Sequence, residues 1–397
     1  MKYCVLIMDG AADLPMADSG KTCLELARTP NLDVMAKQGV LGVARTVPAG
    51  MEPSSACACM SLLGYDPTVY YRGRAGIEAV SMGIPVNQRE VVFRCNLVSV
   101  RDGKMHDYSA GHISTEEAKE LISALNHKMG TKEVTFYPGV SYRHILKLAN
   151  HERTLLATCT PPHDIPDYPI ASFLPRGQGS RFLLDLMKRS KAVLDDHPVN
   201  ASRRERGLET ATTIWLFWGT GSIPDMPSFE RVYGLKAAMT SGVDLLKGLA
   251  QMMGMSILQV EGATDGLDND YLGQVEAALG VLGTHDLAVI HVEAPDEAGH
   301  SGAVKEKIAA IELIDQNIVG RLLGRHEDAL RVLVIPDHPT PISIRTHSAD
   351  AVPFLFWGEG FNSNGATRFT ESEGKRTGLI IERGCNIMGR FVQKRTG

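Results

Sequence analysis

Nearly uninterrupted apolar runs recur in the first and last parts of the chain, at residues 3–8, 286–292 and 331–336. Such runs are typical of strands that are buried on both faces of a parallel sheet. Between them, stretches such as 31–39 and 303–323 carry apolar residues at helical spacing. The alternation predicts an α/β fold, with a doubly wound, mostly parallel sheet that has helices on both faces.

The pattern changes from about residue 89. Residues 91–100 form a strand-like run, and further strand-like runs follow it. Ser114 and Glu117 have the spacing of a capping box before an amphipathic helix expected at 115–128. A second amphipathic helix is expected at 182–197. These features indicate an α+β unit in the middle of the chain.

Near residue 210 the α/β alternation resumes, with a strand predicted at 212–219 and a helix predicted at 234–254. Since the two ends of the chain share one pattern and the middle differs, we expect a single core with a separate domain inserted into it. The expected core is discontinuous and consists of residues 1–88 and 210–397. The expected inserted domain is smaller and consists of residues 89–209.

The composition is that of a globular enzyme. A chain of 397 residues is long for one core, which favours roughly two domains. Hydrophobic residues make up 44%, charged residues 22%, and the net charge is −5. This charge gives no general attraction to nucleic acid or an anionic membrane, and no apolar run reaches the roughly 18 residues of a membrane span. We therefore expect neither as a partner, and a phosphorylated substrate would need a local group of cations.

The seven cysteines are scattered, and the pair Cys57 and Cys59 has no matching second pair for a zinc site. We expect reduced thiols that mostly serve packing. The first residues lack the basic, apolar and small-residue pattern of a signal peptide. These features predict a cytoplasmic protein, and they leave its oligomeric state open.

Acidic and imidazole residues lie at or just after the ends of the three buried runs, or in the adjacent loops. They are Asp9, Asp296, His300, Asp337, His338 and His347. Since the carboxyl ends of parallel strands meet at one edge of a sheet, we expect these side chains to lie close together. Oxygen and imidazole ligands without thiolate suit Mn²⁺, Mg²⁺, Zn²⁺ or Co²⁺, so the pattern predicts a bimetallic site. Taken singly, Asp9 could be a turn residue, Asp296 a helix cap and His338 a core histidine.

Ser54 and Ser55 precede a stretch of small and apolar residues that indicates a helix. Either serine is a candidate N-cap. A nucleophilic hydroxyl is also favoured there, because the free N–H groups at a helix start attract anions. Two metal ions about 3.5–4 Å apart can activate such a hydroxyl and neutralise a phosphoryl group, which makes Ser55 the candidate nucleophile.

Several segments together resemble the archaeal-type cofactor-independent phosphoglycerate mutases, which belong to the alkaline phosphatase superfamily. They are MDG (8–10), the serine before MSLLGYDP (60–67), YRGR (71–74), EAPDEAGH (293–300) and PDHPTP with the following THS (336–348). The resemblance covers nearly the whole chain and implies an alkaline-phosphatase-like fold. It also implies interconversion of 3-phosphoglycerate and 2-phosphoglycerate through a phosphoserine, a reaction of glycolysis and gluconeogenesis.

The resemblance assigns roles to individual residues. One divalent metal ion would be bound by Asp296, His300 and His347. The second would be bound by Asp9, Asp337, His338 and the nucleophile Ser55. Mn²⁺ is the first candidate for both. The inserted domain would close over a small phosphorylated substrate with basic residues. The residues at positions that match basic residues of the family are Arg74, Arg143 and Arg203.

Three features depart from the mutases. Ala56 stands where the family commonly has an aspartate after the nucleophile. The family's arginine-rich stretch DRRAGR is here DYSAGH, residues 107–112, and Gln274 stands where a lysine is usual. Fewer cations weaken the recognition of phosphate and carboxylate groups. The metal ligands themselves are complete.

The segments 109–118, 139–146 and 159–164 are more similar to a bacterial branch of the same family that is proposed to contain homoserine kinases. ATP-dependent phosphoryl transfer to homoserine is therefore an alternative function, although the chain has no GxxxxGK[ST] phosphate loop. A metal-dependent phosphatase or phosphonate hydrolase is a further alternative on this fold. A catalytically silent scaffold is the alternative from another class, and the complete ligand set argues against it.

Overall fold

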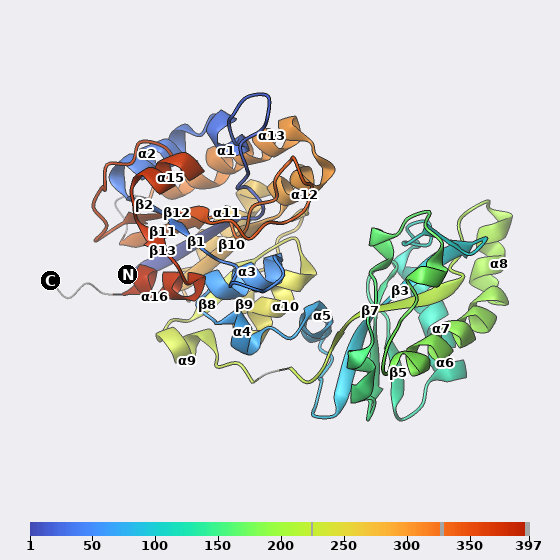
Figure 1. Ribbon diagram of the computed structural model, residues 1–397. Helices are drawn as coiled ribbons and strands as arrows, with labels where there is room; N and C mark the ends of the chain where they lie inside the picture. Colours follow the sequence, from blue (N-terminus) through green and yellow to red (C-terminus); the bar gives the residue numbers. More distant parts are fainter. Residues whose placement is uncertain (224, 326–328, 394–397) are drawn as a thin grey trace. The chain divides into compact units, whose positions relative to one another are not determined.

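The computed structural model describes residues 1–223, 225–325 and 329–393. The chain forms two compact units, which are both drawn in Figure 1. The core unit contains Met1–Tyr71 and Met226–Gly397, and the inserted unit contains Arg72–Asp225. The inserted unit thus extends beyond the expected range at both ends.

The core unit is built on an eight-stranded sheet with the strand order β13-β2-β12-β11-β1-β10-β8-β9. Its strands are β1 (Lys2–Met8), β2 (Val40–Ala44), β8 (Ala237–Thr240), β9 (Ser256–Ile257), β10 (Leu287–Val292), β11 (Leu330–Ile335), β12 (Val352–Gly358) and β13 (Ile380–Ile381). From β11 to β9 all neighbours are parallel, whereas β12 is antiparallel to both β11 and β2. The mostly parallel sheet predicted from the apolar runs is confirmed.

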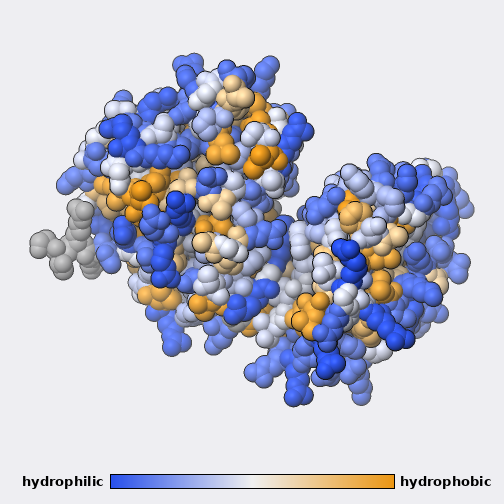
Figure 2. Space-filling view, viewed as in Figure 1, coloured by the Kyte–Doolittle hydropathy of each residue, from blue (hydrophilic) through white to orange (hydrophobic). Residues whose placement is uncertain are grey.

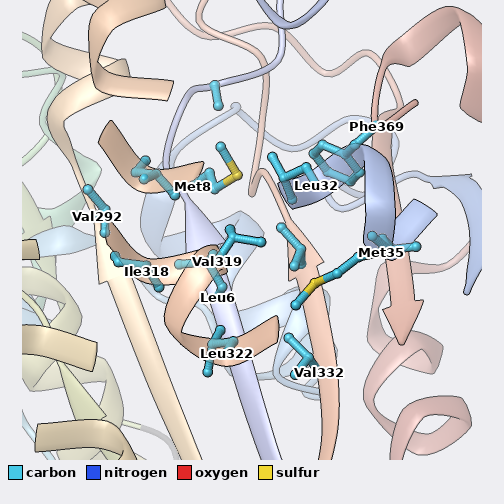
Figure 3. Close-up of a cluster of buried hydrophobic side chains, with 14 of the residues drawn as sticks. Leu6, Met8, Leu32, Met35, Val292, Ile318, Val319, Leu322, Val332 and Phe369 are labelled. Atoms are coloured by element: carbon cyan, nitrogen blue, oxygen red, sulfur yellow. The ribbon is translucent and has the colours of Figure 1, made fainter. Parts of the chain in front are cut away.

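Helices cover both faces of this sheet (Figure 1). They are α1 (Cys23–Leu26), α2 (Pro30–Gln38), α3 (Ser55–Leu62), α4 (Pro67–Tyr70), α9 (Phe229–Tyr233), α10 (Asp244–Met252), α11 (Tyr271–Val281), α12 (Ala294–Ser301), α13 (Val304–Ile314), the π-helical turn η4 (Asp315–Val319), α14 (Gly320–Leu323), α15 (Glu371–Arg376), the 3₁₀ turn η5 (Gly384–Asn386) and α16 (Ile387–Val392). On one face, Leu6 of β1 belongs to the same apolar cluster as Leu32 of α2 and Val319 of η4 (Figure 3). On the other face, the ring of Tyr3 lies 5.6 Å from that of Phe391 in α16. The predicted α/β class is confirmed.

The helix predicted at 234–254 is wrong in its first half. Residues Ala237–Thr240 form strand β8, and α10 begins only at Asp244. Every residue of β8 is buried, and the strand pairs in parallel with β10. Gly242 then separates strand and helix where two backbones come close, since an added Cβ would lie 2.4 Å from the carbonyl oxygen of Thr264. Helix propensity favours this alanine-containing run as a helix, but its place in the sheet decides the conformation.

The long helix predicted at 303–323 is present as α13, η4 and α14 in succession. The π turn starts at Asp315, whose carboxylate accepts the N–H groups of Asn31 at 3.2 Å and Leu32 at 2.7 Å. Thr29, the residue before α2, makes no side-chain capping bond. Asp315 therefore provides from another helix the acceptor that the start of α2 needs.

The inserted unit contains a five-stranded antiparallel sheet, in which β3 pairs with β4, β6 and β7, and β5 pairs with β6. Its strands are β3 (Glu90–Arg101), β4 (Lys104–Asp107), β5 (Val134–Tyr137), β6 (Arg143–Ala149) and β7 (Thr213–Thr220). Its helices are α5 (Arg74–Ser81), α6 (Thr115–Met129), η1 (Glu152–Leu156), η2 (Pro162–Asp164), η3 (Ile170–Ser172), α7 (Ser180–Asp195) and α8 (Pro198–Glu205). Phe93 of β3 shares a core with Leu121 of α6 and Leu183 of α7.

Strand β7 and helix α5 explain why the inserted unit is larger than expected. The run at 212–219 is predicted to return to the core sheet, but β7 is antiparallel to β3. Ala75 and Ala79 of α5 share a smaller cluster with Val92 of β3. Both elements thus belong to the inserted unit, because the partner of a strand depends on tertiary packing and not on the strand's own pattern.

On the face seen in Figure 2, hydrophobic residues occur in small groups among hydrophilic ones. Isolated groups of this kind are normal on protein surfaces. Among the described residues, no helix combines the length and the apolar character that crossing a bilayer requires.

A buried glutamate at the start of α15 gives the core unit a predictable pH dependence. Glu371 accepts hydrogen bonds from the Asp13 N–H and the Thr22 hydroxyl. Burial raises the pKa of Glu371 to about 7. Because the folded-state pKa lies above the usual value of about 4.3, the stability contribution is fully present below that value and is lost as the pH rises through 7.

We expect Glu371→Gln to be more stable than the parent protein at pH 8, by about 3 kcal/mol, because the amide has no charge to bury. The difference should shrink as the pH falls toward 5. Urea unfolding of both metal-free proteins at several pH values measures it. Glu373→Gln is the control of opposite sign, since hydrogen bonding to Arg376 lowers the pKa of Glu373 to about 2. A pH-independent difference for Glu371→Gln would contradict the prediction.

Candidate metal centre and active site

The ligand candidates of the core unit gather at one edge of its sheet. Asp9 directly follows β1, Asp337 follows β11 after one proline, and Asp296 lies in the first turn of α12 behind β10. Strands β11, β1 and β10 are parallel neighbours, so their carboxyl ends lie at the same edge. Residues from both ends of the chain therefore form one site.

A first group consists of Asp9, Asp337, His338 and Ser55, whose side chains are all buried. The Nε2 atom of His338 lies 3.6 Å from Asp9 Oδ1 and 3.3 Å from Asp337 Oδ2. The hydroxyl oxygen of Ser55 lies 3.3 Å from the same nitrogen. One donor atom each from Asp9, Asp337 and His338 lies within 4.8 Å of the others. These distances bring together the set that the resemblance assigns to one metal ion.

Asp296, His300 and His347 form a second group. Nε2 of His300 lies 3.2 Å from Asp296 Oδ2 and 2.9 Å from Nε2 of His347. Nε2 of His347 lies 3.6 Å from Asp296 Oδ1. The rings of His338 and His347 are 4.1 Å apart, so the two groups adjoin each other.

Backbone carbonyls orient two of these imidazoles. Nδ1 of His300 lies 3.1 Å from the carbonyl oxygen of Arg345, and Nδ1 of His347 lies 3.2 Å from that of Pro53. A carbonyl oxygen only accepts, so each Nδ1 carries the hydrogen. In the neutral imidazole the lone pair is then on Nε2 and faces the other ligands, which is the arrangement of metal-binding histidines.

Negative charge is concentrated around Asp9. Its Oδ1 atom is buried and has no hydrogen-bond partner among the described residues. Burial raises the pKa of Asp9 well above its usual value, and the charges of Asp337, Glu293 and Asp296 raise it further. Buried carboxylates in such numbers require a cation or protons. Together with the oxygen and imidazole donors, this excess charge fits a divalent metal ion.

The second group also favours positive charge. The hydrogen bond with Asp296 raises the pKa of His300 to about 9. Burial opposes the charged form of Asp296, but hydrogen bonds with His300 and His347 outweigh it and hold the pKa of Asp296 well below its usual value. In the metal-free protein, imidazole protons thus supply the positive charge that a metal ion would supply. Metal binding is expected to release these protons.

The close approach of β1 to α12 requires a glycine. Gly10 has a φ of +61°, and a Cβ on it would lie 2.5 Å from Asp296 Oδ1. Its N–H donates to Asp337 Oδ1 at 3.1 Å. The glycine of the Asp9-Gly10 turn therefore allows carboxylates from three different segments to lie side by side.

The neighbouring serines have separate roles. Ser54 is the N-cap of α3, and its hydroxyl oxygen accepts the N–H of Cys57 at 3.3 Å. Ser55 is the first residue of the helix, and its hydroxyl lies beside His338. The capping role belongs to Ser54, which leaves the Ser55 hydroxyl available for chemistry.

One residue of the site has no signal in the sequence. His291 is fully buried near the end of β10, and burial lowers its pKa to about 4, so it is neutral. Its Nε2 donates to Asp9 Oδ2 at 2.8 Å, and its Nδ1 accepts from the Ser241 hydroxyl at 3.1 Å. Because His291 stands inside an apolar run, the sequence gives no reason to separate it from the core. Its contacts orient Asp9 as the neighbours of metal ligands commonly do.

We expect His291→Ala to weaken Mn²⁺ binding by about 10–100-fold, because Asp9 loses the donor that fixes its orientation. Titration calorimetry with the metal-free protein measures the change. His285→Ala is the matched control: His285 is also buried and bonds a serine hydroxyl, but it precedes the other end of β10. Equal loss of affinity in both variants would show that a general loss of stability is responsible.

Comparisons with known proteins identify the family. The sequence model of the family described as 2,3-bisphosphoglycerate-independent phosphoglycerate mutase matches residues 36–200. The enzyme of that name from Methanothrix thermoacetophila is 50% identical to this chain over 98% of both chains. The chain belongs to this mutase family. A probable mutase of the same name from Geobacter sulfurreducens is 45% identical over 99% of the chain and 100% of its own length.

Solved structures agree with membership of the mutase family. The PH0037 protein from Pyrococcus horikoshii has a TM-score of 0.83 and 26% identity, with coverage of 100% of this chain and 99% of that one. The cofactor-independent phosphoglycerate mutase from Thermoplasma acidophilum has a TM-score of 0.66 and 26% identity, with 99% of both chains covered. The predicted family and its α/β fold are confirmed. The comparisons do not favour the homoserine kinase alternative.

Two departures from the mutase pattern have structural explanations. Gln274 is fully buried, and its amide donates to the carbonyl oxygen of His291 at 3.1 Å and accepts from Asn269 at 2.9 Å. It joins α11 to β10 and supplies no charge. In the stretch 107–112, the carboxylate of Asp107 accepts the N–H groups of Ser109 at 2.6 Å and Gly111 at 3.0 Å. The stretch is therefore a tight turn that Asp107 closes itself.

Arg203, expected to contact substrate, has its donors occupied within the inserted unit. It is only 3% exposed. Its guanidinium pairs with Glu117 and donates to the carbonyl oxygens of Ala110 at 2.9 Å and Glu209 at 2.6 Å. Arg203 therefore holds the 107–112 turn, and its contact with a substrate stays a prediction.

The other two arginines are more accessible. Arg74 donates to Glu78 at 3.1 Å and lies 4.8 Å from the ring centroid of Trp218. Arg143 is exposed and lies 5.7 Å from the ring centroid of Tyr142. Both guanidinium groups are stacked on aromatic rings, which limits their freedom and leaves N–H groups for an anion.

Proposed function

We propose that this protein interconverts 3-phosphoglycerate and 2-phosphoglycerate by metal-dependent phosphoryl transfer through a phosphoserine at Ser55. The observation that carries the proposal is the position of the Ser55 hydroxyl, 3.3 Å from His338 Nε2 and at the start of α3. Relatives similar over the whole chain bear the name of this mutase. The substrate is then a small phosphorylated acid.

Two divalent metal ions are part of the proposal, with Mn²⁺ as the first candidate and Mg²⁺, Zn²⁺ or Co²⁺ as alternatives. Their ligands would be Asp296, His300 and His347 for one ion, and Asp9, Asp337, His338 and Ser55 for the other. When bound, such ions favour ionisation of a nearby hydroxyl and neutralise the charge on a phosphoryl group.

In the forward reaction, Ser55 Oγ attacks the phosphorus of 3-phosphoglycerate. The Oγ–P bond forms as the bond from phosphorus to the 3-oxygen of glycerate breaks, and the proton lost by Ser55 is balanced by the one that glycerate gains. The retained glycerate then attacks the phosphoserine with its 2-hydroxyl, which releases the Ser55 hydroxyl and yields 2-phosphoglycerate. No water or nucleotide is consumed, so the site must keep water from the phosphoserine.

The local structure supports this role of Ser55. Capping by Ser54 fixes where α3 begins, and the first N–H groups of a helix favour negative charge. Because Ser55 is 9% exposed, its hydroxyl is largely shielded from water. A phosphate on Ser55 would thus be formed in an environment that favours its charge and hinders its hydrolysis.

Arg74 and Arg143 are the proposed substrate-binding cations of the inserted unit. The carboxylate and the phosphate of the substrate each suit a planar guanidinium group. Arg143 is the stronger candidate, because it is exposed and forms no salt bridge with a described residue, whereas Arg74 shares Glu78 with Arg94.

Phosphorus NMR tests the proposal directly. The Mn²⁺-loaded protein is incubated with 3-phosphoglycerate alone and, in parallel, with homoserine and ATP. We expect 2-phosphoglycerate to appear without nucleotide or 2,3-bisphosphoglycerate. Phosphohomoserine in the second reaction, with no change in the first, would replace the mutase by the kinase. Release of inorganic phosphate alone would indicate a phosphatase.

A further inference from the structure

Lys307 of α13 is completely buried in the core unit, which is rare for a lysine. Its Nζ atom donates to the carbonyl oxygen of Ala12 at 3.1 Å, to Asp13 Oδ2 at 3.0 Å and to the carbonyl oxygen of Thr340 at 2.8 Å. An ammonium group has three N–H donors, so all of them are used.

The acceptors of Lys307 belong to the loops that carry the candidate metal ligands. Ala12 follows Asp9 by three residues on the loop after β1, and Thr340 follows His338 by two residues on the loop after β11. The same Ala12 oxygen also accepts the N–H of Thr340 at 3.2 Å. Lys307 thus joins two loops from opposite ends of the chain.

Through Thr340, the hydrogen-bond network of Lys307 extends to the third ligand-bearing segment. The Thr340 hydroxyl donates to Asp296 Oδ1 on α12 and lies 3.3 Å from Nδ1 of His338. Helix α13, which carries Lys307, begins three residues after α12 ends. A single buried ammonium group is therefore connected to the segments of Asp9, Asp296 and His338 without touching any of these ligands.

Hydrogen bonds fix the side chain of Asp13, as they fix that of its partner Lys307. One carboxylate oxygen accepts the N–H groups of Leu14 at 2.8 Å and Ile342 at 3.3 Å, and the other accepts from Lys307. Its own N–H donates to Glu371. The ion pair is thus part of a network that again links the loops after β1 and β11.

Stability alone is a poor explanation for this pair. Removing two charges from water is costly, and a buried ion pair can often be replaced by apolar residues of similar volume without loss of stability. The position of the pair, behind three ligand-bearing segments, is what distinguishes it from an ordinary core contact.

We propose that Lys307, paired with Asp13, is a positioning residue that sets the spacing of the loops holding the two metal ions. This inference rests on the proposed two-metal site. Replacement of the pair should leave the fold intact but loosen the ligands, with loss of metal affinity and a changed distance between the ions.

The test uses the double variant Lys307→Met/Asp13→Asn, which removes both charges and keeps their shapes. The matched control is Arg331→Met. Arg331 is also a buried cation of the core unit, and it donates to the carbonyl oxygens of Glu359, Phe391 and Gln393, but it lies at the start of β11, away from the ligand end. Circular dichroism and thermal unfolding of the metal-free proteins establish that each variant folds.

Mn²⁺ alone is the probe, with affinity measured by calorimetry and the spacing of the bound ions by the exchange splitting of their electron paramagnetic resonance spectrum. We expect at least tenfold weaker binding and an altered spectrum for the double variant, and parental behaviour for Arg331→Met.

Parental affinity and spectrum in the double variant would overturn the inference while leaving the proposed function intact. Equal losses in both variants would also overturn it. If the parent protein itself binds no Mn²⁺, the proposed metal centre fails and this inference fails with it.

Discussion

The Ser55→Ala variant is expected to lose at least about 10⁴-fold in mutase activity, because the hydroxyl that accepts the phosphoryl group is gone. The substitution removes one oxygen from a buried position beside His338, and it leaves Asp9, Asp337 and His338 of the same proposed ligand set in place. Metal affinity should therefore change far less than activity. The measurement is the rate of 2-phosphoglycerate formation, together with mass spectrometry of acid-quenched protein for phosphate on the peptide that contains Ser55.

Ser54→Ala is the matched control for this prediction, since the two serines are adjacent and of the same size. Loss of the Ser54 hydroxyl removes the cap on the N–H of Cys57 and should cost about 1 kcal/mol of stability. The phosphoenzyme should still form. A phosphoenzyme in Ser55→Ala, or its loss only in Ser54→Ala, would contradict the assignment of the nucleophile.

The ligand-bearing edge of the sheet could be predicted because its signals are local. Strands buried on both faces have long apolar runs, and polar residues that directly follow such runs are conspicuous. The carboxyl ends of parallel strands coincide, so Asp9, Asp296 and Asp337 could be grouped without knowledge of the strand order. The only further requirement was that both ends of the chain form one sheet, which the shared pattern indicates.

The supporting residues could not be predicted, because their partners are distant in the sequence. His291 and Lys307 stand in a strand and a helix whose patterns they do not interrupt, and their acceptors lie 282 to 295 residues away or on a later loop. Arg203 stands in a charged run that is typical of an exposed helix end, yet it is buried. Strand β7 was placed in the wrong sheet for the same reason, since edge pairing is decided by tertiary structure.

Removal of metal should both abolish activity and lower the stability of the core unit. A metal ion that binds only the folded state stabilises it by about 4 kcal/mol when its free concentration is a thousand times its Kd. For a unit of this size, such a change corresponds to a shift in Tm on the order of 10 °C. Differential scanning calorimetry of the chelated protein, before and after addition of Mn²⁺, measures the shift. An unchanged Tm with restored activity would show that the ion binds too weakly to act as a resident cofactor.

The variant Asp337→Asn separates metal binding from the structural role of the carboxylate. Asp337 Oδ1 accepts the N–H groups of Gly10 and His338, and an amide oxygen can keep both bonds. We expect the metal-dependent shift in Tm to shrink, while the metal-free variant is at least as stable as the metal-free parent, because the charge of Asp337 disfavours the charged form of Asp9. Asp315→Asn is the control: both oxygens of its carboxylate accept hydrogen bonds at the start of α2 and it belongs to neither ligand set, so an amide there should lower Tm equally with and without metal. If metal-free Asp337→Asn has a higher Tm than the metal-free parent and metal-free Asp315→Asn has a lower one, the buried carboxylates around Asp9 are kept together for the cation and not for the fold.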